Sequence, residues 1–478
     1  MRVQKRSTPE LLSRFFLELK RRAEDGLRAL PLPFLAELGL VDTGVRFRHA
    51  VFSHPVGVDD AMLRALHAAA RSVGLADEQP RFEDFKTDRC VDEALAATLA
   101  WIYLAASLSS AEVPLVDDER ILCFDAGGGT CDVAAVQVRG LKKFRQDPGS
   151  AVVDVHLLAN GGDPRFGGTD VDRTLATWLL QELQKRPEGA AVDVDGLTRA
   201  LFYPSYEAWR RARGEAPTGD AARAARAVFS KASDVLRAAE RMKKQLSDEP
   251  TSSWVASLDD WPGRGARLPE GRPQRGRVEV SLTRDGFERL LHEPFDKAAA
   301  LIDPVVDAAG WSMADVTTLL FTGQTSKIPA LRKAVLGRVM ARRGVTPPPF
   351  VVEPGRVAAF DVKRCVAQGA AILGDSRRGG GGWLKVTRRS TTALSASLQT
   401  RRGPLLVDVK GLDAGAPLPA RAVVAFGEPA SRLTLYVAGV PAWECSWDGV
   451  VDTVDVEASA EGRFVVFVGS RSVEMRRM

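Results

Sequence analysis

The stretch that most constrains this chain is Ile121–Val138, ILCFDAGGGTCDVAAVQV, where three glycines and a threonine separate two aspartates. An apolar run lies on each side of the turn, which predicts two strands joined through the glycines. Clustered glycines let backbone N–H groups approach a phosphate closely. Asp125 and Asp132 are of the type that holds magnesium through water or orients an attacking water. The alternative is an ordinary glycine-rich hairpin with charged shoulders, and the stretch alone leaves both open.

Composition narrows the class of protein. The chain has 478 residues, of which 45% are apolar, so it can form sizeable cores. The net charge is 66 − 61 = +5 with the charges interspersed, which favours a mixed solvated surface over a nucleic-acid partner. The five cysteines show no CxxC spacing and the five histidines no ligand spacing, which argues against a disulfide framework and a metal cage.

No segment reads as a targeting or membrane element. The first residues lack the apolar core of a signal peptide, and the most apolar run, 94–108, is short and alanine-rich, which favours a buried helix. We therefore expect a cytoplasmic protein with no membrane partner.

The chain divides into two parts by pattern. Helices are expected at 8–28, 61–73, 94–108 and 284–309 and dominate 171–246; strands are expected at 47–52, 152–158 and 317–321; and 250–277 reads as loop or edge hairpin. This mixture predicts an α/β domain over 1–375. SRRGGGG at 376–382 has the composition of a flexible linker. Short alternating runs at 421–426, 432–439 and 463–469 predict a small all-β domain over 383–478.

Neither common phosphate-loop pattern, GxxxxGK[ST] or GxGxxG before a helix, occurs in the sequence. FDAGGGTCDVA instead resembles the second phosphate-binding hairpin, near FDLGGGTFDVS, of the heat-shock protein 70 chaperones. Further stretches resemble that family in the same order. They are AVFSHPVGVDDAMLRALHAAARSVGL (50–75), VDEALAATLAW (91–101), GGDPRFGGTDVDRTL (161–175), LRAAERMKKQLS (236–247), LLFTGQTSKIPALRKAV (319–335) and KRCVAQGAAI (363–372).

The stretch at 236–247 can also be read from spacing alone. Apolar residues recur on one helical face, at Val235, Ala239, Met242 and Leu246. Polar residues share another face, at Glu240, Lys243, Lys244 and Ser247. Such a face is usually only solvated, but within this ordered set of motifs it becomes a candidate nucleoside-binding face.

The resemblance implies an actin-like ATPase (ribonuclease H-like) nucleotide-binding domain, N-terminally incomplete, and a β-sandwich peptide-binding domain without a helical lid. It implies ATP or ADP with Mg²⁺ as cofactors. It places catalytic roles on Glu93, Asp125, Asp132 and Thr130, with Asp125 and Asp132 holding the metal through water. It places nucleotide contacts on Gly127, Gly128, Gly129, Gly167, Gly168, Glu240, Lys243, Lys244, Ser247, Gly323, Gln324 and Lys327.

The sequence departs from the family at three places. No stretch resembles the first phosphate hairpin, near GIDLGTT, so ATP hydrolysis is expected to be weak or lost, because positioning dominates phosphoryl transfer. Another chain would complete that lobe, or the gene start is misplaced or the gene is split or decayed. Lys244 and Lys327 stand where the family has two adenine-stacking arginines, and Gln324 stands where it has a glycine, which predicts weakened adenosine affinity. The glycine linker replaces a short apolar one.

Two functions follow as hypotheses. The first is a divergent heat-shock protein 70-type chaperone that binds Mg-ATP or ADP and controls the binding of unfolded or extended apolar peptide segments, with J-domain and nucleotide-exchange co-chaperones as partners. The alternative is a non-hydrolysing nucleotide sensor or scaffold. A sugar or acetate kinase on the same scaffold fits the order of the motifs less well.

Overall fold

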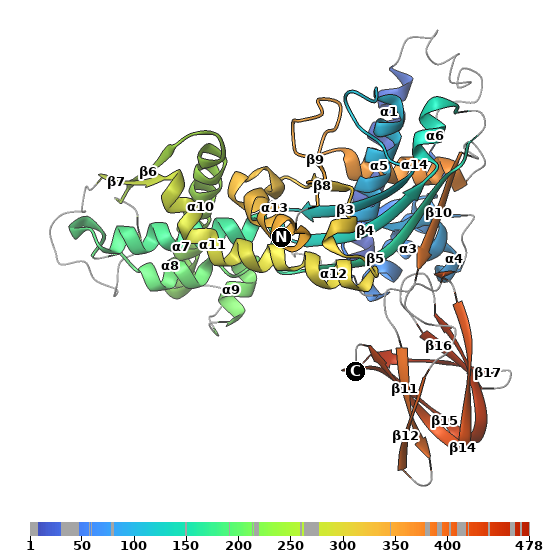
Figure 1. The fold of residues 1–478 in the computed structure, drawn as a ribbon. Helices are drawn as coiled ribbons and strands as arrows, with labels where there is room; N and C mark the ends of the chain where they lie inside the picture. Colours follow the sequence, from blue (N-terminus) through green and yellow to red (C-terminus); the bar gives the residue numbers. More distant parts are fainter. Residues whose placement is uncertain are drawn as a thin grey trace.

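The computed structural model is drawn as a ribbon in Figure 1. It describes residues 8–29, 47–56, 58, 60–77, 81–148, 151–190, 192–212, 214, 219–258, 261, 277–344, 346–377, 383–389, 394–400, 403–408, 417–418, 420–437, 440–458, 464–468 and 471–477.

A seven-stranded mixed sheet lies at the centre of the first part of the chain, in the order β13-β10-β5-β4-β3-β8-β9. Its strands are β3 (Asp118–Ala126), β4 (Cys131–Arg139), β5 (Val153–Asp163), β8 (Thr318–Thr322), β9 (Phe350–Val352), β10 (Leu384–Arg389) and β13 (Pro417–Leu418). β3, β4 and β5 form an antiparallel meander, and β8 and β9 continue the sheet parallel to β3. Both faces are covered, which explains why β3 and β4 read as near-continuous apolar runs.

Alternate side chains of β3 enter two different cores. Leu122 and Phe124 belong to one apolar cluster and Ile121 and Cys123 to the other, as the two-residue period of a strand requires. The second cluster is covered by α5 (Glu93–Ser107), α6 (Leu141–Gln146) and α14 (Cys365–Arg377).

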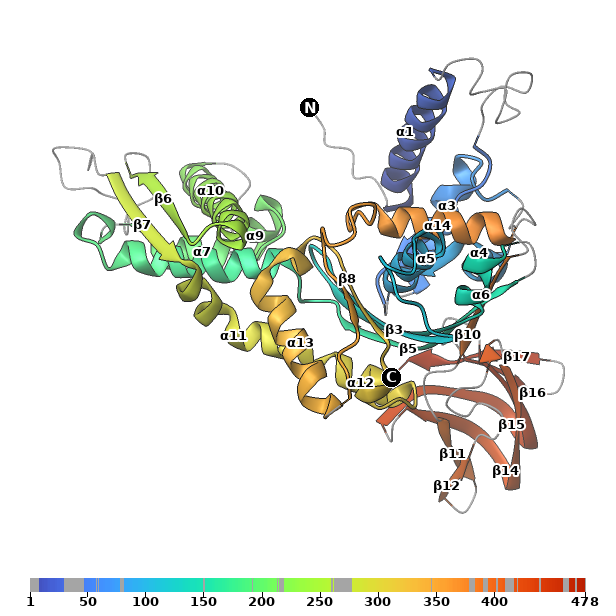
Figure 2. The same cartoon turned by 45° about the horizontal axis from the view of Figure 1, so that its top comes forward.

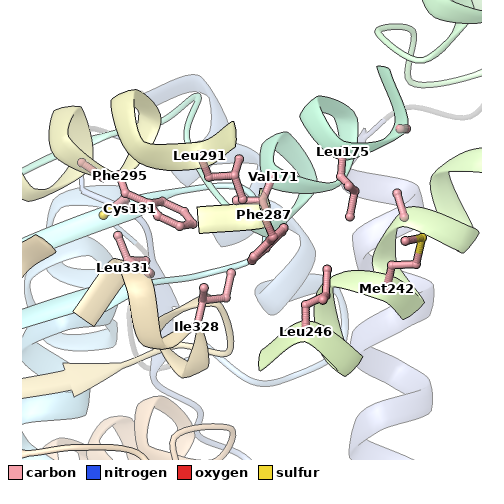
Figure 3. Packing of buried hydrophobic residues seen from close by; sticks show 14 of the residues in the cluster. Cys131, Val171, Leu175, Met242, Leu246, Phe287, Leu291, Phe295, Ile328 and Leu331 are labelled. Atoms are coloured by element: carbon pink, nitrogen blue, oxygen red, sulfur yellow. The ribbon is translucent and has the colours of Figure 1, made fainter. Parts of the chain in front are cut away.

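The first cluster is covered by helices, most of which extend away from the sheet as an arm at the left of Figure 1. They are α7 (Gly168–Gln184), α8 (Val194–Ala200), α9 (Tyr206–Ala212), α10 (Asp220–Asp248), α11 (Arg284–Ala300), α12 (Ile302–Ala308) and α13 (Pro329–Arg343), with the hairpin β6 (Thr251–Ser257) and β7 (Arg277–Thr283). Short 3₁₀ turns lie at Pro187–Gly189 (η1), Met313–Asp315 (η2) and Thr325–Lys327 (η3). Figure 3 shows side chains of α7, α10, α11 and α13 meeting in this core.

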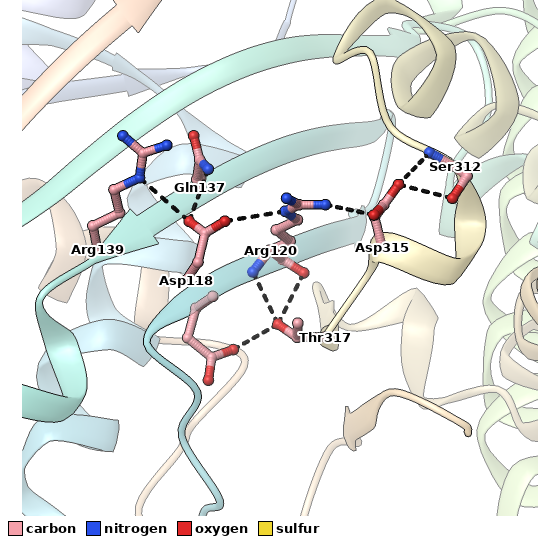
Figure 4. Close-up of polar contacts among 8 residues, drawn as sticks. Asp118, Arg120, Gln137, Arg139, Ser312, Asp315 and Thr317 are labelled. Carbon is pink, nitrogen blue, oxygen red and sulfur yellow. Dashed lines mark hydrogen bonds and ion pairs between the residues drawn. The ribbon is translucent and has the colours of Figure 1, made fainter. Parts of the chain in front are cut away.

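A polar network fixes the register between β3 and β8 at the end of β3 away from the glycine turn (Figure 4). The Arg120 backbone N–H donates to Thr317 Oγ1 at 2.9 Å, and its guanidinium pairs with Asp315 and Asp118. The buried Glu119 carboxylate accepts from Thr317 Oγ1 at 2.6 Å. This register places Asp125 beside Thr322 at the other end of the two strands.

A smaller lobe precedes the sheet. Its two parallel strands are β1 (Phe52–His54) and β2 (Cys90–Asp92). Its helices α1 (Thr8–Arg28), α3 (Asp60–Ser72) and α4 (Phe82–Arg89) pack around Phe16, Leu63 and Phe85.

The C-terminal strands form a second sheet in the order β12-β11-β14-β15-β16-β17, with β18 pairing to β15. They are β11 (Leu394–Thr400), β12 (Gly403–Asp408), β14 (Ala420–Val437), β15 (Val440–Ala458), β16 (Phe464–Val468), β17 (Arg471–Glu474) and β18 (Arg476–Arg477). β10 and β13, which the sequence analysis assigns to the C-terminal β domain, instead lie in the first sheet, and β10 pairs parallel to β5.

Several sequence expectations are confirmed, including the helix at 8–28 and the strands around the glycines. Three local ones were wrong. The strand expected at 47–52 lies at 52–54. The helix expected at 284–309 is broken at Leu301, because Pro304 lacks the N–H that would bond to Ala300.

The third wrong expectation is that the runs at 421–426 and 432–439 are separate short strands. They form one strand, β14, up to Val437. The residues between the runs are absorbed as a register shift between Ala425 and Ala430 rather than a turn. In the expected linker, Ser376 and Arg377 end α14, and residues 378–382 lie outside the described part of the chain.

The crossing of α5 and α14 gives a test of packing. A Cβ at Gly369 would lie 1.6 Å from the Ala96 carbonyl oxygen, so the helices approach as closely as backbone allows. We expect Gly369→Ala to lower the free energy of unfolding by about 1–3 kcal/mol or more. Gly26→Ala, in α1 with nothing within 4 Å of the added Cβ, should raise it by about 0.5–1 kcal/mol. Urea denaturation of both variants measures the difference, and equal effects would contradict the packing.

Candidate functional site: the glycine turn and its carboxylates

The turn between β3 and β4 brings two aspartates face to face. Asp125 and Asp132 are register partners across the pair, and Gly127 N–H closes the turn on the Thr130 carbonyl at 2.9 Å. Both aspartates are buried, with 5% and 2% of their surface exposed, whereas the turn residues Gly128 and Gly129 are exposed. The hairpin therefore presents its backbone outward above a buried acidic pair.

The N-terminus of α7 is tied to this turn. Gly168 N–H donates to the Gly127 carbonyl at 3.0 Å, and Thr169 N–H donates to the Gly128 carbonyl at 2.8 Å. Thr325 Oγ1, from η3, also donates to the Gly127 carbonyl at 2.7 Å. The carbonyls of Gly127 and Gly128 are thus hydrogen-bonded by α7 and η3. The positive end of a 17-residue helix lies beside the turn, which favours an anion there.

The glycines fit this close assembly. A Cβ at Gly167 would lie 2.6 Å from the Gly129 nitrogen, and one at Gly168 would lie 2.6 Å from Thr325 Oγ1. Gly323 has φ +78°, and its Cβ would lie 2.2 Å from the Ala126 carbonyl oxygen. By contrast, Cβ atoms at Gly128 and Gly129 would meet nothing within 4 Å. The open side of the turn has room for a ligand to approach its backbone, as a bound phosphate group would require.

The smaller lobe contacts the acidic pair directly. Val56 N–H, in the loop after β1, donates to Asp132 Oδ1 at 3.1 Å, and Thr130 Oγ1 donates to Oδ2 of the same carboxylate at 3.1 Å. Glu93 is the first residue of α5, whose N-cap Asp92 accepts from Leu95 N–H at 2.9 Å. Glu93, Asp125 and Asp132, three carboxylates with predicted catalytic roles, are therefore close enough to influence one another electrostatically.

Burial raises the pKa values of the three carboxyl groups Glu93, Asp125 and Asp132. It raises the pKa of Asp125 to about 7, and the charges of Glu93 and Asp132 act in the same direction. Burial also raises the pKa of Asp132 to about 7 against the hydrogen bonds from Thr130 and Val56. The pKa of Glu93 is raised by burial and then by Asp92. A site that holds several carboxylates in this condition gains from a bound cation.

α10 reaches the turn through Lys243. Its ammonium group donates to the Gly168 carbonyl at 3.1 Å and pairs with the buried Asp172 at 2.8 Å. Lys244 pairs with Glu240 at 2.6 Å on the exposed side of the helix, and Ser247 Oγ donates to the Lys243 carbonyl at 3.0 Å. The apolar face of the helix is buried as expected, and Figure 3 shows Met242 and Leu246 in the core.

The segment after β8 completes the surroundings. Gln324 and Lys327 are exposed there, and Thr325 meets Lys243 at the position that a Gly168 Cβ would occupy. The turn, α7, α10 and η3 thus converge on Gly168. In the described part of the chain, no hydrogen bond or ion pair joins the turn to Glu240, Lys244, Ser247, Gln324 or Lys327, so their nucleotide contacts stay predictions.

Direct metal ligation is a separate matter. Within the described residues, no group of three or more His, Cys, Asp or Glu side chains is arranged to hold a metal ion. The sequence analysis expects Asp125 and Asp132 to hold magnesium through water, and that expectation stays a prediction.

Sequence reasoning missed several residues of the site. Thr322, fully buried, hydrogen-bonds Asp125; Thr325 holds the turn; and Asp172 pairs with Lys243. Thr325 and Asp172 lie in stretches that the motif comparison covered, within TGQTSK and GGTDVD. Their polar side chains beside glycines were the available signal. The Val56 N–H gives no sequence signal, because a backbone N–H donor is present at nearly every residue.

The acidic pair predicts a pH-dependent stability. The pKa values of Asp125 and Asp132 are near 7 in the folded chain and 3.8 in the unfolded chain. The folded chain therefore binds more protons than the unfolded chain between about pH 4 and 7, and its stability falls as the pH rises through this range. Asp125→Asn should remove part of this loss, raising the free energy of unfolding at pH 8 by about 2 kcal/mol more than at pH 5. Urea denaturation at both pH values measures it. A purely steric effect would shift both equally and contradict the account.

No helix in the described part of the chain is long and apolar enough to cross a membrane.

Two comparisons with known proteins found similar sequences. Residues 41–201, which carry Glu93, the glycine turn and the start of α7, match the family model described as Hsp70 protein. The chain is 27% identical over 379 residues to the chaperone protein DnaK of Thermoplasma volcanium. That alignment covers 78% of this chain and 45% of DnaK, so the chain spans less than half the length of this relative. These similarities relate the chain to the Hsp70 family.

Proposed function

We propose that this chain is a divergent Hsp70-type chaperone module that binds Mg-ADP and Mg-ATP at the β3–β4 turn. One observation carries the proposal: the exposed glycine backbone, the N-terminus of α7 and Lys243 converge above a buried pair of aspartates. Backbone N–H groups and a helix N-terminus favour phosphate oxygens, and the carboxylates favour the cation that accompanies them.

Each group has a role in this proposal. Gly128 and Gly129 N–H groups and Thr130 Oγ1 bind phosphate oxygens, while Asp125 and Asp132 hold magnesium through water. Magnesium bound with the phosphates neutralises their charge. Glu93 begins α5 and acts electrostatically on Asp125, and its carboxylate would accept a proton from an ordered water.

The nucleoside would lie between the polar face of α10 and the segment from Gly323 to Lys327. Glu240 and Ser247 are suited to the ribose hydroxyls or the adenine edge, and the stems of Lys244 and Lys327 to the ring. Because an ammonium group cannot stack on a base as a guanidinium does, we expect weaker adenosine affinity than with arginine at these positions.

The C-terminal β part would bind extended apolar peptide segments by strand addition. A physical link to the nucleotide site exists in β5. Its residues 153–157 pair with β10, and its other end, at Gly162, pairs with Asp132. β10 is anchored where Trp383 stacks on Phe144 at 5.1 Å and accepts from Val153 N–H at 2.6 Å. J-domain proteins and nucleotide-exchange factors are the partners that the proposal implies.

A second candidate is a non-hydrolysing nucleotide sensor. It is favoured by the smaller lobe, whose sheet has only two strands among the described residues. The lobe reaches the acidic pair through Val56 N–H rather than through a second glycine loop.

Calorimetric titration tests the nucleotide site. We expect ADP to bind the full chain in magnesium, and Gly168→Ala to weaken binding roughly tenfold or more, about 1.4 kcal/mol, because its Cβ would push Thr325 from the turn. Gly26→Ala, remote and in open space, is the control and should bind as the unmodified chain does.

Single-turnover hydrolysis of ATP then separates the two candidates. Binding with turnover that Glu93→Gln abolishes supports the ATPase chaperone, and binding without turnover supports the sensor. If neither ADP nor ATP binds at millimolar concentration, both candidates fail.

A further inference from the structure

Thr325 joins two parts of the candidate site that are far apart in the sequence. It lies in η3, between β8 and α13, and only 4% of its surface is exposed. Its Oγ1 donates to the Gly127 carbonyl at 2.7 Å, across 198 residues of sequence. In Figures 1 and 2, α13 lies beside the start of α7, at the end of the central sheet where the arm begins. A hydroxyl from the segment proposed to hold the nucleoside thus reaches the turn proposed to hold the phosphates.

Backbone contacts fix the place of this hydroxyl. Gly323 precedes η3 with φ +78°, and a Cβ there would lie 2.2 Å from the Ala126 carbonyl oxygen. A Cβ at Gly168, on the other side, would lie 2.6 Å from Thr325 Oγ1. Ser326 Oγ donates to the Gly323 carbonyl at 2.7 Å and closes η3 on itself. The segment therefore has little room to shift relative to the turn.

The Gly127 carbonyl accepts two hydrogen bonds, from Gly168 N–H at 3.0 Å and from Thr325 Oγ1 at 2.7 Å. These donors use both lone pairs of the carbonyl oxygen. Because a trans peptide unit is planar, its C=O and the N–H of the next residue point in opposite directions. The N–H of Gly128 is therefore turned away from α7 and η3. No hydrogen bond between described residues uses this N–H.

The next peptide unit follows the same rule. The Gly128 carbonyl accepts from Thr169 N–H at 2.8 Å, so the Gly129 N–H also points away from α7. Two successive N–H groups that point away from their support suit the oxygens of an anion. Thr325 supplies the one side-chain hydrogen bond of this support, and it can be removed without changing the backbone.

We propose that Thr325 is a positioning residue for phosphate recognition, whose hydroxyl holds the Gly127–Gly128 peptide so that the Gly128 N–H faces a phosphate oxygen of the ligand. This inference rests on the proposed nucleotide site. It adds that recognition of the phosphates depends on the segment that would hold the nucleoside. The group recognised at the turn is a magnesium-bound diphosphate, so Mg-pyrophosphate, which has no nucleoside, should occupy it.

Calorimetric titration of the full chain with Mg-ADP, and with Mg-pyrophosphate in competition, tests the proposal. Thr325→Val has nearly the same shape and lacks the hydroxyl. It should weaken the binding of both ligands by the same factor, about three- to tenfold, as expected for the loss of one hydrogen bond. Thr325→Ser keeps the hydroxyl and should bind both ligands as the unmodified chain does.

Thr174→Val is the matched control. Thr174 Oγ1 donates to the Asp170 carbonyl at 2.9 Å within α7, so this variant also loses a hydroxyl-to-carbonyl bond, but one that does not touch the turn. Its affinity for both ligands should equal that of the unmodified chain. Urea denaturation establishes that each variant is folded, and Thr325→Ala replaces Thr325→Val if the latter is unfolded.

The outcomes separate this inference from the proposed function. An unmodified chain that binds neither ligand contradicts the nucleotide site itself, and this inference with it. If the unmodified chain binds Mg-ADP, three results overturn the role of Thr325 alone. These are unchanged affinity in Thr325→Val, weakened binding of Mg-ADP without weakened binding of Mg-pyrophosphate, and equal weakening in Thr325→Ser, which would mean that the methyl group matters and the hydroxyl does not.

Discussion

The pairing of Asp125 with Asp132 across a four-residue glycine turn is the constraint on which the rest of the site depends. Burying two carboxylates side by side is costly unless hydrogen bonds or a cation compensate. The fold supplies hydrogen bonds from three directions: Thr322 on β8, Val56 in the small lobe and Thr130 in the turn. They offset the cost only in part, since both pKa values remain near 7. A cation bound beside these carboxylates would lower the remaining cost.

The surrounding architecture serves to keep that turn in place. Carbonyls of the turn are held by the first residues of α7 and by Thr325, while β3 itself is locked to β8 by the network around Arg120 at its far end (Figure 4). β5 runs from this site to the pairing with β10, which begins the C-terminal strands. The glycine turn and the first of the C-terminal strands are therefore joined through one continuous strand, β5.

Local pattern predicted the elements whose signals are local. The apolar runs around the glycines gave the β3–β4 hairpin, and the 3.6-residue spacing of Val235, Ala239, Met242 and Leu246 gave the buried face of α10. Pairings between distant segments were not accessible in this way. LKVTRR at 384–389 shows strand character, but nothing local tells that it joins β5 rather than the C-terminal sheet. The break at Leu301 had a local signal in Pro304, which was overlooked.

Hydrogen exchange of the full chain, with and without Mg-ADP, tests the central claim most directly, because it locates the ligand on the backbone. The account predicts slower exchange in two separate segments, the turn at 127–130 and the start of α7 at 168–170, with little change in the C-terminal sheet at 443–446. Exchange that is unchanged in both segments at saturating Mg-ADP would contradict it, because the glycine turn would then not be where the phosphates bind.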